Sequence, residues 1–227
     1  MKSLYSKALP VLVFVFMLVA LWGAFLYAPE EKTMREVQRI FYFHVASWWA
    51  AFIALTVTFS ASIGYLWKGC RRYDDVALSS TEIGVLFTTI GLVTGPIWAK
   101  KAWGIYWTWD ARLTTALVLW LMYVGYLMLR RYVPEEEKRA TLAAVVAIIA
   151  FVDVPVVFLA IRLWRTQHPQ PVLMGGESSG LHPQMFHALM MAFGAFLLLY
   201  LWLLDKRLAV ESAQGEVDRL HKELDLA

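Results

Sequence analysis

Long apolar stretches alternate with short polar connections along the whole chain. Six stretches are close to the roughly 20 residues that a helix needs to cross a bilayer, and they occupy residues 9–28, 41–67, 76–98, 113–129, 141–164 and 185–204. In lipid, a spanning segment must satisfy its own backbone hydrogen bonds, which a helix does. The pattern therefore predicts an all-α integral membrane bundle of six transmembrane helices.

The connections between these stretches differ in their content of basic residues. Lys and Arg are more frequent near the N-terminus, in the connections after the second and fourth spans, and in the C-terminal tail. Because basic residues favour the cytoplasmic side of a membrane, both termini are predicted to be cytoplasmic. The connections 29–40, 99–112 and 165–184 are then expected on the external side of the membrane.

Composition agrees with a membrane protein and excludes several other classes. The chain is 59% hydrophobic and 17% charged, whereas a soluble domain is about half apolar and about a quarter charged. The net charge of +3 and the lack of a recognition motif do not indicate a nucleic-acid partner. The one cysteine, Cys70, excludes both an internal disulfide and a CxxCH site for covalent haem.

The last part of the chain differs from the rest. After residue 204, charged residues surround apolar positions at helical spacing, which indicates a cytoplasmic amphipathic tail. These apolar positions are Leu208, Val217, Leu220 and Leu224. We therefore divide the chain into a six-span membrane domain, residues 1–204, and a tail, residues 205–227.

One connection is unusually rich in tryptophan. Residues 103–112 read W-G-I-Y-W-T-W-D-A-R, and Trp98 precedes them. Tryptophan favours the membrane–water interface, so an aromatic belt is one interpretation. A belt needs no fixed order, however, whereas Gly104 and Asp110 are interleaved here at short spacing. Broad apolar rings in a loop also form a surface suited to a large planar ligand, which is the interpretation we favour.

The candidate residues of this loop serve different purposes. Gly104 allows the backbone to approach a ligand closely. Asp110 and Arg112 either pair with each other and fix the loop, or Arg112 meets a carboxylate of the ligand. The full candidate set is Trp103, Gly104, Trp107, Trp109, Asp110 and Arg112.

Three histidines are expected near the external side. His44 lies at the external end of the second span, His168 follows the fifth span, and His182 precedes the sixth. A single histidine at a helix end is more often structural, but neutral imidazole is also the common protein ligand of haem iron. Because six spans place His44, the tryptophan-rich loop and His168 on the same side of the membrane, one shared site is possible.

Two acidic residues lie within predicted spans, where ionisable groups are candidates for function. Asp153 lies mid-span beside Pro155, which interrupts helical hydrogen bonding, and Glu82 lies toward the cytoplasmic end of the third span. For both we favour a structural pairing with a neighbouring helix.

The motif from Trp103 to Asp110, W-G-x-x-W-x-W-D, resembles the signature of the WWD-domain haem-handling proteins of cytochrome c biogenesis. Its continuation, A-R-L-T, is similar to the CcmC branch, the haem exporter protein C family. Further similarities are T-G-P-I-W ending at Trp98, R-I-F-Y-F-H ending at His44, and W-R-T-Q-H ending at His168. The resemblance covers nearly the whole chain.

The resemblance implies a haem-binding and transfer protein and not a conventional enzyme. Such a protein holds haem b non-covalently at the external face and delivers it to the haem chaperone CcmE, beside the transporter subunits CcmA and CcmB and the small subunit CcmD. By the family pattern, His44 and His168 are the axial ligands and the candidate loop residues hold the macrocycle. Pro169 and the additional His182 depart from that pattern, so His182 stays open as a less favoured second ligand.

Three other functions are compatible with part of the sequence. A WWD-type haem lyase would act directly on apocytochrome c, but the A-R-L-T continuation and the lack of a large external domain argue against it. A two-haem electron carrier would need histidine pairs at mid-membrane. A secondary transporter with Asp153 on its path would leave the tryptophan-rich loop unexplained.

Overall fold

A computed structural model describes residues 2–169 and 180–225 of the chain. These residues form helices and no strand. Six helical stretches are long and apolar enough to cross a membrane: Ala8–Tyr27, Arg35–Lys68, Arg71–Trp103, Ala111–Tyr132, Glu136–Leu163 and Pro183–His221. The predicted all-α bundle of six spans is therefore confirmed.

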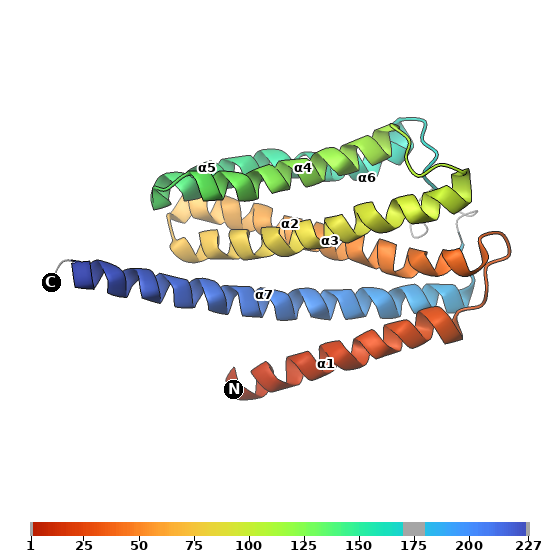
Figure 1. The fold of residues 1–227 in the computed structure, drawn as a ribbon, viewed down its shortest axis with the longest axis horizontal. Coiled ribbons are helices and arrows are strands. Elements are labelled where there is room, and N and C mark those ends of the chain that lie inside the picture. The colour runs from red at the N-terminus through yellow and green to blue at the C-terminus, as the bar shows by residue number, and fades with distance from the viewer. Residues whose placement is uncertain (1, 170–179, 226–227) are drawn as a thin grey trace.

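The helices follow one another with short connections. In chain order they are α1 (Lys2–Trp22), a π-helical turn (Gly23–Tyr27), a 3-10 turn (Arg35–Arg39), α2 (Ile40–Lys68), α3 (Arg71–Trp103), α4 (Ala111–Tyr132), α5 (Glu136–Phe151), α6 (Asp153–Leu163) and α7 (Pro183–Asp225). In Figure 1, α4, α5 and α6 form one layer, α2 and α3 the next, and α7 and α1 follow.

The two ends of the bundle carry different parts of the chain. Both termini lie at one end, together with the α2–α3 and α4–α5 turns, and we call this the terminal end (Figure 1). The connections that leave α1, α3 and α6 lie at the opposite end, which we call the loop end. The loop end thus collects segments that are far apart in the sequence.

Small residues allow α2 and α3 to pack closely. A Cβ added to Gly91 of α3 would lie 2.4 Å from Nε1 of Trp48, and one added to Gly84 would lie 2.8 Å from Cδ2 of Leu55. Because transmembrane helices associate through close packing rather than through hydrophobic burial, these glycines fix how α2 lies against α3. The same contact determines where the loop-end residues of both helices meet.

The fifth span is two helices and not the single one expected. The α5 helix ends at Phe151 and α6 begins at Asp153, with the backbone N–H of Val152 bonded to the Ile149 carbonyl at 3.2 Å. Pro155 explains the break, because proline lacks the N–H that would bond to the Phe151 carbonyl and its ring clashes there. The short α6 then leads to the segment that contains His168.

The α7 helix runs for 43 residues and continues through residue 204 without a break. Its extension contacts the bundle, because Arg207 pairs with Glu82 of α3 and with Glu211 of α7, the latter at 2.7 Å. The structural pairing expected for Glu82 is therefore present. The division into domains at residue 204 stays a prediction.

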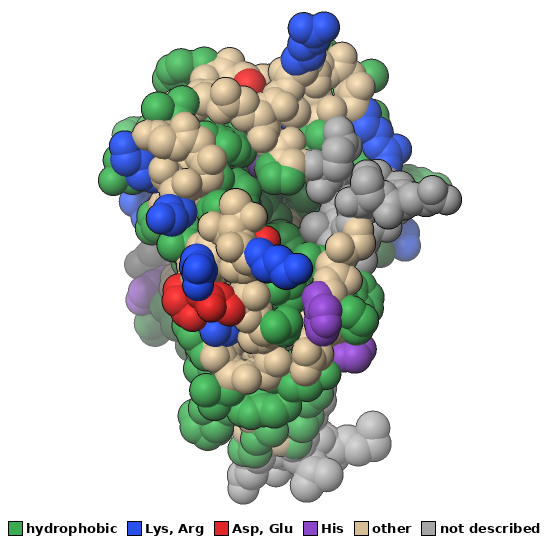
Figure 2. Space-filling model, turned by 90° about the vertical axis from the view of Figure 1, so that its right-hand side faces the viewer, with side chains coloured by type: hydrophobic (Ala, Val, Ile, Leu, Met, Phe, Trp, Pro, Cys, Tyr) green, Lys and Arg blue, Asp and Glu red, His purple; other side chains and the backbone are tan. Residues whose placement is uncertain are grey.

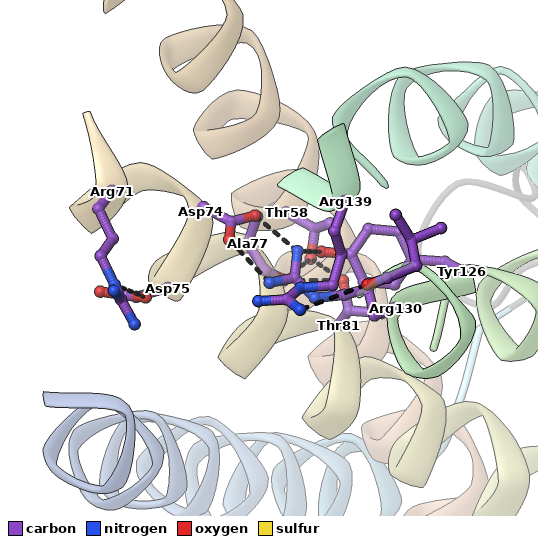
Figure 3. A network of polar contacts seen from close by, with 10 residues as sticks. Thr58, Arg71, Asp74, Asp75, Ala77, Thr81, Tyr126, Arg130 and Arg139 are labelled. Atoms are coloured by element: carbon purple, nitrogen blue, oxygen red, sulfur yellow. Dashed lines mark hydrogen bonds and ion pairs between the residues drawn. The ribbon is translucent and has the colours of Figure 1, made fainter. Parts of the chain in front are cut away.

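Charged residues pair with one another at the terminal end. Asp74 of α3 accepts two hydrogen bonds from Arg130 of α4, at 2.6 and 2.7 Å, and both side chains are nearly buried (Figure 3). Nearby, Arg71 lies 2.5 Å from Glu136 and 3.8 Å from Asp75. These pairs join α3 to α4 and α5.

Candidate functional site

A cavity of about 430 Å³ opens at the loop end, among α2, α3, α4, α6 and α7. Its size falls within the roughly 300–1,000 Å³ of sites for small molecules and cofactors. The lining is mostly apolar and aromatic, and its few polar side chains include His44, Arg112 and His168. Figure 2 views the molecule from this end.

His44 reaches the cavity from the start of α2. Its Nδ1 lies 2.9 Å from Oγ1 of Thr94 on α3. The Thr94 hydroxyl donates to the Ile90 carbonyl at 2.7 Å. Because a hydroxyl has a single proton to donate, Thr94 accepts from Nδ1–H of His44. That tautomer leaves the lone pair of His44 on Nε2, the arrangement typical of metal-binding histidine.

His168 reaches the same cavity from the segment after α6. Its Nδ1 lies 2.9 Å from the carbonyl oxygen of Pro169. A carbonyl can only accept, so Nδ1 of His168 carries the proton and Nε2 carries the lone pair. Burial and the nearby charge of Arg112 lower the pKa of His168 to about 4. The imidazole is therefore neutral at pH 7, the form that coordinates a metal.

Arg112 is the cation of the cavity wall. It lies in the first turn of α4, donates to the Val157 carbonyl of α6, and sits 6.0 Å from the ring centroid of Trp48. Within the described chain it forms no ion pair with Asp110, so the first of the two expectations for this pair is wrong. Its charge is available to an anionic group that enters the cavity.

Asp110 has a structural role instead. One carboxylate oxygen accepts from the backbone N–H of Leu113 at 3.1 Å and thereby caps α4, as aspartate commonly does. The other accepts from the Thr108 hydroxyl at 2.9 Å. Burial raises the pKa of Asp110, but these hydrogen bonds, together with those from Thr166 and from the backbone of Arg112, outweigh burial and hold the pKa below its usual value. Asp110 therefore fixes the loop at the start of α4.

The tryptophans divide into two groups. Trp98, Trp103 and Trp107 line the cavity, and the rings of Trp98 and Trp103 meet edge to face at 5.8 Å. The indole N–H of Trp107 is buried without a hydrogen-bond partner in the described residues. Trp109, by contrast, is 75% exposed. Gly104 does not line the cavity, and it ends α3 in a left-handed conformation with φ of +79°, which glycine adopts without strain.

Comparison with known proteins gives the family. The family model described as CcmC, heme exporter protein C, matches residues 1–223. The chain belongs to the heme exporter protein C family. Relatives named heme exporter protein C include those of Bradyrhizobium diazoefficiens, 32% identical over 78% of this chain and 67% of the relative, and Escherichia coli strain K12, 33% identical over 79% and 71%. The Haemophilus influenzae relative is 29% identical over 87% of this chain and 80% of its own length.

Five residues predicted for the site do meet in one cavity. They are His44, Trp103, Trp107, Arg112 and His168. Three others, Gly104, Trp109 and Asp110, do not line it. Their assignment to ligand binding stays a prediction, as does that of the five.

His182 lies outside the cavity lining. It is exposed directly before α7, and its Nδ1 accepts from the backbone N–H of Gln184 at 3.4 Å. A histidine in this position helps to satisfy the free N–H groups at a helix start. The geometry therefore favours His168 over His182 as the second histidine of the site.

Sequence reasoning missed several residues of the site. Trp48 lies four residues after His44, which places both on one face of α2, so helical spacing could have identified it. Thr94 lies in the T-G-P-I-W motif, but the sequence alone indicated no role for its hydroxyl. Its contact with His44 depends on how α3 packs against α2, and local sequence does not encode this.

The pairing expected for Asp153 is not found in the described residues. We expected it to pair with a neighbouring helix, but its Oδ2 is buried without a hydrogen-bond partner among the described residues. It does not line the cavity. Asp153 instead occupies the first position of α6, at the break in the fifth span.

Proposed function

We propose that the chain holds haem b non-covalently in the loop-end cavity, with His44 and His168 as axial ligands. The observation that carries the proposal is the pair of imidazoles in one aromatic cavity, each with Nδ1 hydrogen-bonded and Nε2 left with its lone pair. Two axial ligands lie on opposite faces of the planar haem and must come from separate segments, and α2 and the segment after α6 offer one histidine each. The names of the relatives support haem as the cargo.

The rest of the cavity fits the same cargo. Apolar and aromatic side chains suit a macrocycle. Arg112 offers a guanidinium to a propionate, which is a strong charge-assisted interaction. The unpartnered indole N–H of Trp107 offers a further hydrogen-bond donor.

The protein's role is haem transfer in cytochrome c biogenesis, and we propose that it is not an enzyme. Haem is held at the periplasmic face of the bacterial inner membrane and is delivered to CcmE, beside CcmA, CcmB and CcmD. In support, the exposed apolar side chains of Ile105, Tyr106 and Trp109 stand on the loop beside the cavity, where a haem acceptor can dock. The loop end is also opposite both termini, in agreement with the distribution of basic residues (Figure 1).

Optical spectra of the purified protein supplied with haem test the site. We expect a low-spin spectrum typical of two imidazole ligands for the wild type, and its loss in His44→Ala and in His168→Ala. His182→Ala is the matched control, because it removes a neighbouring histidine that does not line the cavity. An unchanged spectrum in both cavity variants contradicts the assignment, and a wild type that takes up no haem contradicts the function.

The direction of transfer needs a second experiment. The haem-loaded protein is mixed with purified CcmE or with an apocytochrome c, and haem is followed on each acceptor. We expect haem to move to CcmE. Thioether formation on the apocytochrome without CcmE would instead support the haem lyase.

A further inference from the structure

Thr94 does not line the cavity, but it contacts a histidine that does. Its Oγ1 lies 2.9 Å from Nδ1 of His44. The hydroxyl is itself fixed, because it lies 2.7 Å from the Ile90 carbonyl and 3.4 Å from that of Gly91. Its proton goes to the nearer carbonyl, so it presents a lone pair to His44. The Gly91 carbonyl of α3 also hydrogen-bonds to His44, so the Thr94 hydroxyl and a backbone acceptor on the same helix together favour the proton on Nδ1.

The surroundings hold the His44 ring in place. A Cβ on Gly95 would lie 3.2 Å from Cε1 of His44, so the imidazole packs against backbone where a side chain would crowd it. One turn away, the indole of Trp48 packs against Gly91. His44 is thus held between two helices whose separation is fixed by glycine contacts.

The other cavity histidine is held differently. Nδ1 of His168 donates to the carbonyl of the next residue, Pro169, and its backbone N–H donates to the Thr166 hydroxyl at 3.1 Å. Both contacts belong to the same short segment. His44 alone of these two depends on a side chain from another helix.

We propose that Thr94 is a positioning residue, which sets the tautomer and orientation of His44 before haem arrives. An acceptor at Nδ1 fixes the ring, directs the Nε2 lone pair outward and increases the basicity of the ligand. The role of Thr94 in haem retention rests on the proposed function, because it requires that His44 bind the iron. The tautomer of His44 in the haem-free protein does not require this.

The chain offers a matched control on the same helix. Thr89 of α3 donates to the Val85 carbonyl at 2.7 Å and accepts from Nε1 of Trp120 on α4 at 2.8 Å. Its hydroxyl therefore makes the same pair of bonds as that of Thr94, but it does not contact the cavity histidines. Thr89→Val removes an equivalent bond between helices away from the site.

The first measurement is nitrogen NMR of the full-length, haem-free protein in detergent, with labelled histidine and with His44→Gln to assign the signal. We expect the wild type, Thr94→Ser and Thr89→Val to carry the His44 proton on Nδ1. Thr94→Val, which keeps the shape but removes the hydroxyl, is expected to shift the proton toward Nε2. The same tautomer in Thr94→Val and the wild type would overturn the proposal.

The second measurement is the rate at which haem leaves for an excess of apomyoglobin. Because loss of a second-sphere partner costs about 10–100-fold in metal affinity, we expect Thr94→Val to release haem about 10–100 times faster, and Thr89→Val and Thr94→Ser to match the wild type. If the wild type holds haem and Thr94→Val releases it no faster than Thr89→Val, the positioning role is wrong. If the wild type takes up no haem, the proposed function itself is wrong.

Discussion

At the terminal end of the bundle Asp74 and Arg130 face each other through two hydrogen bonds, whereas at the loop end Arg112 lies in an apolar cavity and pairs with no carboxylate of the described residues. A buried charge is costly unless it is paired. The terminal end meets this requirement with its own side chains. The loop end leaves a cation and the indole N–H of Trp107 for something else to satisfy.

The cavities at the two ends differ in the same way. The one at the terminal end, about 310 Å³, is lined largely by charged side chains. Five of these pair with one another: Arg71, Asp74, Asp75, Arg130 and Glu136. The one at the loop end is lined by aromatic rings and two imidazoles. Charge pairing therefore joins the helices at one end of the bundle, whereas the other end has an apolar cavity with unpaired polar groups, as the proposed haem site requires.

The largest effect is expected from breaking the buried pair at the terminal end. Asp74→Ala leaves Arg130 buried and unpaired, which typically costs about 3–5 kcal/mol. Chemical denaturation in detergent should show this loss of stability. The double variant Asp74→Leu/Arg130→Met should recover most of it, because no charge then stays unpaired. Equal losses in the single and double variants would contradict the view that pairing is the role of these residues.

A smaller effect is expected at Trp107, where stability without haem and affinity for haem should respond differently to substitution. Trp107→Phe removes a buried donor that lacks a partner, and such a donor costs about 1–3 kcal/mol. The haem-free protein should therefore lose no thermal stability, while its affinity for haem falls. Thermal unfolding without haem and haem titration measure the two effects. A clear loss of stability in the haem-free variant would show that the indole is structural.

The pH dependence of stability provides a third test. The pKa of His168 is about 4 in the folded protein, against about 6.5 for an ordinary histidine. Between these values the unfolded chain binds a proton more readily. The stabilising contribution is therefore complete above about pH 6.5 and is lost as the pH falls toward 4. The haem-free wild type should lose more stability than His168→Ala over this range, and parallel curves would contradict the burial of His168.

The smallest effect is expected on the extension of α7. Arg219 pairs with Glu216 at 2.5 Å, but both side chains are more than half exposed. Exposed ion pairs of this kind contribute about 0–1 kcal/mol. Arg219→Ala should change stability by less than about 0.5 kcal/mol and leave haem binding unaltered. A larger loss would mean that the α7 extension stabilises the bundle more than its own contacts indicate.

Sequence reasoning predicted much of the fold and part of the site. The six spans follow from hydropathy alone, because lipid leaves a chain few ways to satisfy its backbone other than as a helix. Spacing then identified Trp103, Trp107 and Arg112 as site candidates. The number of spans between them placed His44 and His168 on one side of the membrane, which made a common site possible.

Several features could not be predicted in this way. The break at Val152 was signalled by Pro155, but whether a proline kinks or divides a helix depends on its neighbours. Trp109 points outward while Trp107 lines the cavity, and the order of residues in a loop does not determine which face turns inward. The tail beyond residue 204 continues α7, where composition indicated a boundary.

The sequence by itself determined the number of membrane spans, the end of the bundle that carries the tryptophan-rich loop, and the family. These depend on the local balance of apolar and polar residues and on motifs read within one segment. The tertiary structure decided that Thr94 supports His44, that Arg112 lies beside Trp48, and that Asp110 caps α4 without pairing with Arg112. Each of these contacts depends on the three-dimensional packing of helices and loops, which local patterns do not specify.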